Sequence, residues 1–103
     1  MERKAFSVAG RTVVVVGAAR SGVAAAELLA RRGAGVTLTE MREAFDGMER
    51  LRLSGIELEL GGHREQTFAD ASLVVVSPGV PLEQPVFDKA LAAASRRSKE
   101  LAG

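Results

Sequence analysis

The chain has 103 residues, a length typical of one domain that folds around a single core without disulfides or metal. With 47% hydrophobic and 26% charged residues it is not a disordered or fibrous protein, and a net charge of +1 with only four aromatic residues, all Phe, does not indicate a nucleic-acid surface. Since Cys is absent and no apolar run approaches the roughly 20 residues that span a bilayer, we expect a cytoplasmic domain with neither nucleic acid nor membrane as partner.

The first predicted elements are a strand, a glycine turn and a helix. Thr12 to Val16 forms a continuous apolar run, which is typical of a parallel strand covered on both faces. Residues 21–32 then follow a helical pattern, in which Ser21 can cap the first turn and Gly33 ends the last.

The next predicted elements are a strand at residues 36–39, a helix at 44–53 and a strand at 56–60. The last of these alternates apolar and acidic residues, so we expect it at an edge of the sheet. A loop or one-turn helix follows, and residues 73–76 repeat the buried-strand composition of the first strand. Pro85 is suited to begin a final helix that runs to about Ser95.

This alternation predicts an α/β fold, a Rossmann-like open parallel sheet with helices on both faces. Because crossovers between parallel strands are right-handed, the expected strand order is 3-2-1-4. The loops that begin at Gly17 and Ser77 then open side by side at the carboxyl edge of the sheet, where such folds bind ligands.

The glycine turn GAARSG places Gly17, Ala19 and Gly22 where the dinucleotide fingerprint has three glycines. A methyl group at the second place crowds a close-lying pyrophosphate, which weakens the dinucleotide interpretation. The amide groups at the start of the helix still favour an anion. Alternatively, the glycines serve only a tight connection, and Ser21 either caps the helix or also donates to a phosphate.

Further candidate residues follow the second and fourth strands. Glu40 lies 23 positions after Gly17, near the place of the acid that binds a ribose in dinucleotide folds, or it is a solvated strand end. Arg42 is either a phosphate ligand or an ordinary surface arginine. The sequence Ser77-Pro78-Gly79 places a hydroxyl, a rigid turn and a bare backbone opposite the first loop. His63 has no second ligand at metal spacing, so we expect a loop residue there.

Taken together, GAARSG after a valine strand, EMR at the end of the second strand, LELGGH, and VVVSPGVP before a proline-led helix resemble the N-terminal domain of the Mur ligases of peptidoglycan synthesis. The resemblance covers roughly residues 8–95 and is strongest to the branch that adds D-glutamate. It implies a domain that holds the UDP portion of UDP-N-acetylmuramoyl-L-alanine.

The resemblance also implies roles for individual residues. The amides of the turn would face the diphosphate, Glu40, Met41 and Arg42 would lie beside the uridine and its phosphates, and Ser77, Pro78 and Gly79 would line the muramoyl side. Some relatives have a hydroxyl residue where this chain has Met41. The implied UDP-substrate residues of the turn are Gly17, Ala18, Ala19, Arg20, Ser21 and Gly22.

In the family, ATP and magnesium are held by a central domain, so the resemblance implies no cofactor, no metal and no catalytic residue in this chain, only a part of an ATP-dependent ligase. We expect residues 1–95 to form the substrate-binding domain and 96–103 to be a polar tail, with the fold truncated after the helix that follows strand 4. The fourth strand would then be an open edge through which copies of the chain self-associate.

Two other functions remain open at this point. One is a NAD(P)- or FAD-binding Rossmann module of a reductase or nucleotide sensor, which Glu40 favours and Ala19 disfavours. The other is a small interaction domain whose glycine turn is architectural only.

Overall fold

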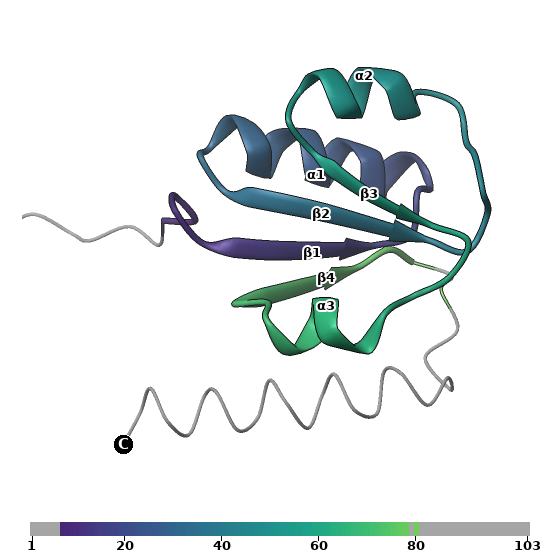
Figure 1. Ribbon diagram of the computed structural model, residues 1–103. Helices are drawn as coiled ribbons and strands as arrows, with labels where there is room; N and C mark the ends of the chain where they lie inside the picture. The colour runs from purple at the N-terminus through teal and green to yellow at the C-terminus, as the bar shows by residue number, and fades with distance from the viewer. Residues whose placement is uncertain (1–6, 79, 81–103) are drawn as a thin grey trace, which may run out of the picture.

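The computed structural model describes residues 7–78 and residue 80. Its strands are β1 (Thr12–Val16), β2 (Gly35–Glu40), β3 (Glu57–Leu60) and β4 (Leu73–Val76), and its helices are α1 (Arg20–Arg31), α2 (Met48–Leu53) and α3 (Glu65–Ala69). The four strands form one sheet in the order β3-β2-β1-β4, and every neighbouring pair is parallel (Figure 1). The predicted fold class and strand order are therefore confirmed.

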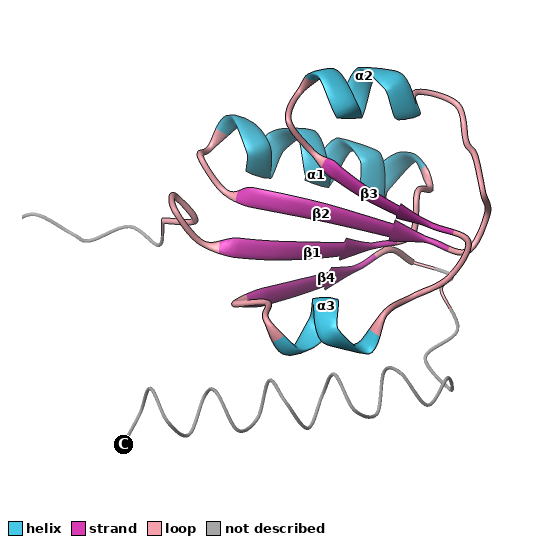
Figure 2. Cartoon of the chain, in the orientation of Figure 1, coloured by secondary structure: helices cyan, strands magenta, loops and turns pink. Residues whose placement is uncertain are grey.

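Helices cover both faces of the sheet, as expected from the buried valine run of β1. Helices α1 and α2 lie on one face and α3 lies on the other (Figure 2). Val13 and Val15 pack into the cluster under α1 and α2, whereas Val14 and Val16 pack with Phe68 of α3. All four valines are 0% exposed, so β1 is the centre of both hydrophobic layers.

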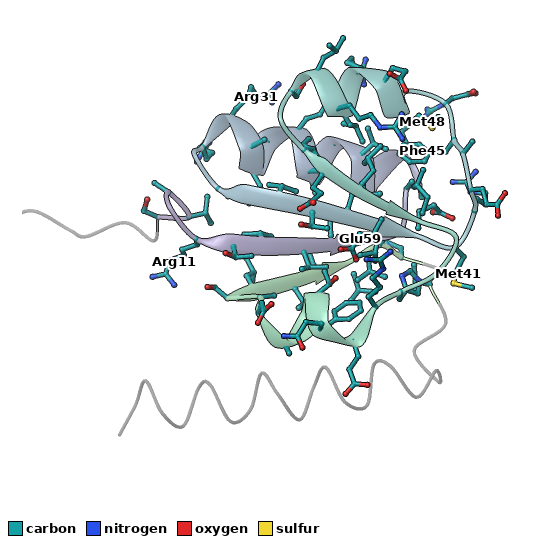
Figure 3. The ribbon with its side chains drawn as sticks, viewed as in Figure 1. Arg11, Arg31, Met41, Phe45, Met48 and Glu59 are labelled. Carbon is teal, nitrogen blue, oxygen red and sulfur yellow. The ribbon has the colours of Figure 1, made fainter. Side chains whose placement is uncertain are left out.

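The second helix is shorter than predicted. Its hydrophobic spacing indicated residues 44–53, but α2 begins at Met48 because Gly47 adopts a left-handed conformation with φ of 90°. Phe45 nevertheless packs against the core from the preceding loop, on the sheet side of α2 in Figure 3. The apolar spacing thus predicted the burial of Phe45 correctly, but it predicted a helical conformation for residues 44–47 wrongly.

The remaining boundaries agree with the prediction to within one or two residues. The expected edge position of the third strand is confirmed, and α3 is the expected short helix. Among the described strands β4 forms the other edge of the sheet. The predicted helix from Pro85 to Ser95 and the tail at 96–103 lie outside the described residues. No described helix is long and apolar enough to cross a membrane.

Candidate functional site at the carboxyl edge of β1, β2 and β4

The turn between β1 and α1 requires both of its glycines. Gly17 has a positive φ of 96°, which residues with a side chain rarely adopt, and its amide donates to the Thr39 carbonyl oxygen at 2.8 Å. A Cβ at Gly22 would lie 2.1 Å from the Gly17 carbonyl oxygen and 2.3 Å from Ser77 Oγ. The start of α1 therefore packs directly on β1 and on the loop after β4.

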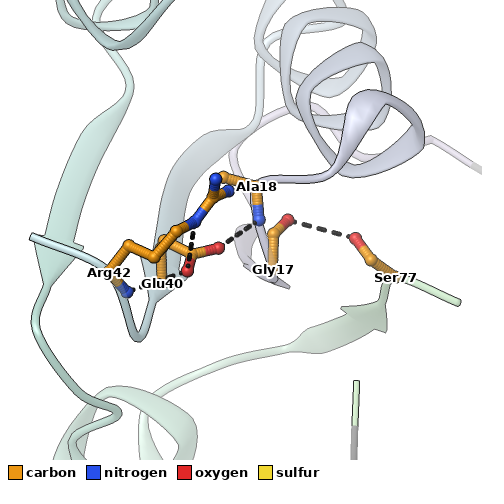
Figure 4. A network of polar contacts seen from close by, with 5 residues as sticks. All are labelled: Gly17, Ala18, Glu40, Arg42 and Ser77. Carbon is orange, nitrogen blue, oxygen red and sulfur yellow. Dashed lines mark hydrogen bonds and ion pairs between the residues drawn. The ribbon is translucent and has the colours of Figure 1, made fainter. Parts of the chain in front are cut away.

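Ser77 closes the junction between the two loops. Its Oγ donates to the Gly17 carbonyl oxygen at 3.1 Å, and its backbone amide donates to the Val16 carbonyl oxygen at 2.9 Å. The prediction that the two loops meet at the switch point is confirmed. A residue that lines a substrate cleft is expected to be exposed, but Ser77 is only 4% exposed and its hydroxyl points at the turn (Figure 4).

The N-terminus of α1 has no side-chain cap. The N-cap residue is Ala19, whose side chain accepts no hydrogen bond, and no acidic residue occupies the first turn. The expectation that Ser21 caps this helix is wrong, since Ser21 already lies within it. Ala19, Arg20 and Ser21 are exposed residues, and they lie at the positive end of the α1 helix dipole.

Glu40 at the end of β2 connects the second strand to the turn. One carboxylate oxygen, Oε1, accepts a hydrogen bond from the Ala18 amide at 2.8 Å. The other, Oε2, accepts from the Arg42 amide at 2.9 Å and from Arg42 Nε at 3.1 Å (Figure 4). Glu40 is 8% exposed and Ala18 is also buried, so Glu40 is not a solvated strand end.

The pKa of Glu40 reflects this binding. Burial raises it, but the hydrogen bonds from the Arg42 side chain, the Arg42 amide and the Ala18 amide outweigh burial, and with the charge of Arg42 they lower the pKa to about 2. The carboxylate is therefore ionised at neutral pH. Hydrogen bonding and the charge of Glu40 raise the pKa of Arg42 in turn.

Arg42 and Met41 form the outer lip of this edge. Within the Arg42 guanidinium, Nε is the atom bonded to Glu40, and the side chain remains 59% exposed. Met41 is 55% exposed and points away from the sheet (Figure 3). Pro78, which follows Ser77 in the loop after β4, is exposed, and Gly79 lies outside the described residues.

The structure thus brings most of the predicted residues together. Gly17, Ala18, Glu40, Arg42 and Ser77 form one polar network, and Ala19, Arg20, Ser21 and Gly22 adjoin it along α1. Arg20 also lines an open hollow of about 350 Å³ between α1 and the segment that leads into α2.

One polar pair at this edge was not anticipated. His63 Nδ1 lies 2.8 Å from the hydroxyl oxygen of Thr39, a residue that is 0% exposed, and the His63 ring meets Phe68 edge-on. Burial lowers the pKa of His63, opposed by the charge of Glu40. Since Thr39 and His63 are 24 residues apart, no short-range spacing signals this contact. The described residues contain no group of three or more potential metal ligands.

Comparison of the sequence with known proteins identifies relatives of this chain. The model of a family described as Mur ligase MurD-like, N-terminal domain matches residues 11–97. The chain is 46% identical over 81 residues to a UDP-N-acetylmuramoylalanine--D-glutamate ligase of Geotalea daltonii, covering 76% of this chain and 18% of the relative. It is 45% identical over 99 residues to a ligase of the same name from Geobacter metallireducens, covering 93% and 21%.

The chain thus spans about a fifth of the length of these relatives. Among solved structures, the A chain of dipicolinate synthase from Bacillus subtilis matches with a TM-score of 0.65 at 22% identity, covering 84% of this chain and 28% of that one. A likeness at this identity concerns the fold alone.

Proposed function

Since the chain belongs to the family of MurD-like N-terminal domains of Mur ligases, we propose that it binds the UDP portion of UDP-N-acetylmuramoyl-L-alanine within a UDP-N-acetylmuramoylalanine--D-glutamate ligase. The observation that carries this proposal is the N-terminus of α1, which has no side-chain cap and lies beside the network in which Glu40 joins the Ala18 amide to the Arg42 guanidinium. The domain binds and positions the substrate of an enzyme that makes a bond between a carboxylate and D-glutamate.

A helix end without a capping side chain leaves amides without a hydrogen-bond acceptor, and a bound anion supplies one. Replacing a capping side chain by Ala costs about 1 kcal/mol, so Ala19 at the N-cap leaves amides that a diphosphate would satisfy. We place the diphosphate on the amides of the exposed residues 19–21, where the Ser21 hydroxyl is available as a further donor. Arg42 supplies a positive charge from the neighbouring strand end.

We place the muramoyl side of the substrate at Pro78, the exposed residue of the loop after β4. Ser77 acts behind it by holding the Gly17 carbonyl, and so fixes the turn rather than contacting the sugar.

ATP and magnesium do not fit the residues of this chain. The turn from Gly17 to Gly22 has the glycine spacing of a phosphate loop but is followed by Val23, where such a loop needs Lys. The described residues also offer no cluster of metal ligands. The ATP-dependent step is therefore proposed for other parts of the complete ligase.

The dinucleotide alternative is disfavoured by two observations at the same edge. Both oxygens of Glu40 already accept hydrogen bonds from the protein, whereas the corresponding acid of a dinucleotide site accepts from a ribose. Ala19 occupies the place of the second fingerprint glycine.

Isothermal titration calorimetry tests the proposal. UDP and UDP-N-acetylmuramoyl-L-alanine should bind the chain, and NADH should give no signal. A millimolar Kd would support the proposal, because a chain that spans a fifth of the ligase makes only part of the substrate contacts. Arg42→Ala should weaken UDP binding about tenfold through loss of a charge-assisted contact. Arg31→Ala, at the far end of α1, is the matched control and should bind UDP as the parent does. Binding of NADH without UDP would overturn the assignment.

A further inference from the structure

The buried carboxylate of Glu40 is bonded much as a small anion would be, by two amides and one guanidinium. Such a group either competes with a ligand for these donors or holds them in place for one. The choice between the two can be made from exposure, because a ligand reaches only donors that face solvent.

The donors that Glu40 occupies are the inner ones. Ala18 is 8% exposed and its amide is turned to Oε1, whereas the amides that follow it belong to the exposed residues Ala19, Arg20 and Ser21. Likewise Nε of Arg42 faces Glu40 while the side chain as a whole is 59% exposed. Glu40 therefore satisfies the buried Ala18 amide and the inner side of the Arg42 guanidinium, and the outer part of the Arg42 side chain stays exposed.

From this arrangement we propose that Glu40 is a positioning residue, which locks the Ala18 amide and aligns the Arg42 guanidinium so that its terminal nitrogens face the anion bound by the turn. The proposal rests on the proposed UDP function. It assigns Glu40 no ligand contact of its own, unlike the residue at this place in a dinucleotide site.

The geometry explains why a carboxylate is needed. An amide side chain would still accept from Ala18, but its NH₂ group would then oppose the Arg42 amide and Nε, which are both donors. Glu40→Gln therefore releases Arg42, which must be ordered again when the ligand binds. Immobilising one such side chain corresponds to roughly a three- to tenfold loss in affinity.

Removing a negative charge near a phosphate acts in the opposite direction, so a charge control is essential. Glu43→Gln removes the same charge from an exposed residue next to Arg42 in the chain. A general field effect predicts that both variants bind UDP equally well or more tightly than the parent. Positioning predicts that Glu40→Gln binds more weakly while Glu43→Gln does not.

The experiment is a calorimetric titration of UDP into the parent, Glu40→Gln, Arg42→Ala, the double variant and Glu43→Gln, with folding checked by circular dichroism. Glu40→Gln should bind three- to tenfold more weakly than the parent, but should add less than twofold to the defect of Arg42→Ala, because Glu40 acts through Arg42. A merely structural role would give independent losses. Arg42→Lys, which keeps the charge without the planar fork, should share the defect and serves if Glu40→Gln does not fold.

The outcomes separate this inference from the proposed function. If the parent fails to bind UDP, the proposed function fails. If the parent binds UDP but Glu40→Gln binds equally or more tightly, the carboxylate is a competitor or a bystander, and the positioning role is overturned. Additive losses in the double variant overturn it as well.

Discussion

Replacing Gly22 with Ala is the sharpest test of the junction between β1, α1 and β4. The added methyl group would lie 2.1 Å from the Gly17 carbonyl oxygen and 2.3 Å from Ser77 Oγ, and contacts of Cβ below 3.0 Å are essentially never seen. One of these neighbours is backbone, so rotation of a side chain does not relieve the clash. Either α1 or the turn must move by about 1 Å, which breaks the packing that defines the site.

The magnitude follows from three contributions. Overpacking costs about 1–3 kcal/mol, and loss of the buried hydrogen bond from Ser77 to Gly17 adds about 1 kcal/mol. The better helix propensity of Ala returns at most about 1 kcal/mol. We therefore expect Gly22→Ala to lower the free energy of unfolding by about 1–3 kcal/mol.

Urea denaturation followed by circular dichroism measures this difference, and Gly35→Ala is the matched control. A Cβ at Gly35 would meet its nearest neighbour, the Arg11 carbonyl oxygen, at 3.9 Å, and Gly35 does not have a positive φ. Gly35→Ala should therefore stay within about 0.5 kcal/mol of the parent. If Gly22→Ala were as stable as Gly35→Ala, the close approach of α1 to the two loops would be refuted.

Three further predictions concern polar groups at the same edge. Ser77→Ala should lower the free energy of unfolding by about 1–3 kcal/mol in urea titrations, since it leaves the buried Gly17 carbonyl without its donor; an unchanged midpoint would contradict this bond. The pKa of Glu40 falls from 4.5 in the unfolded chain to about 2 in the folded chain, so its ionised carboxylate stabilises the fold by up to about 3 kcal/mol. This stabilisation is complete above about pH 4.5 and is lost as the pH falls through 2. The acid unfolding profile of Glu40→Gln should lack this loss of stability. Because burial lowers the pKa of His63, the unfolded chain takes up the imidazole proton at a higher pH than the folded chain does, and the free energy of unfolding should fall as the pH drops below about 6.5. In His63→Gln this fall should be smaller. An identical pH profile would contradict the burial of His63 beside Thr39.

The order of the strands could be predicted because it depends on few physical constraints. The valine runs at residues 13–16 and 74–76 identify strands that belong in a parallel sheet, and the right-handedness of crossovers fixes their order. The start of α2 could not be predicted from hydrophobic spacing, because Phe45 reaches the core from a loop. A buried residue at helical spacing belongs to the helix only where the backbone stays helical between them, and here the left-handed Gly47 separates Phe45 from α2.

The composition of the site was predictable, but the direction of its hydrogen bonds was not. Strand ends in a parallel sheet meet at one edge, so Gly17, Glu40, Arg42 and Ser77 could be placed together from their positions alone. Whether a hydroxyl or a carboxylate at such an edge turns to solvent or to the backbone depends on how close the neighbouring loop approaches. The close packing of Gly22 brings Ser77 against the Gly17 carbonyl, and the Ala18 amide of the same turn binds Glu40, so both side chains turn inward.

The two glycines of the turn carry less information about the ligand than about the fold. Gly17 and Gly22 are required by backbone geometry and close packing whatever the site binds. The ligand preference must come from the groups that remain exposed, which include two donor groups, the uncapped start of α1 and the Arg42 guanidinium. In a dinucleotide site the end of the second strand offers an acceptor to a ribose. Here both carboxylate oxygens of Glu40 already accept hydrogen bonds within the protein and a cation stands beside them, which favours a ligand that brings acceptor oxygens, such as the proposed diphosphate, to this edge.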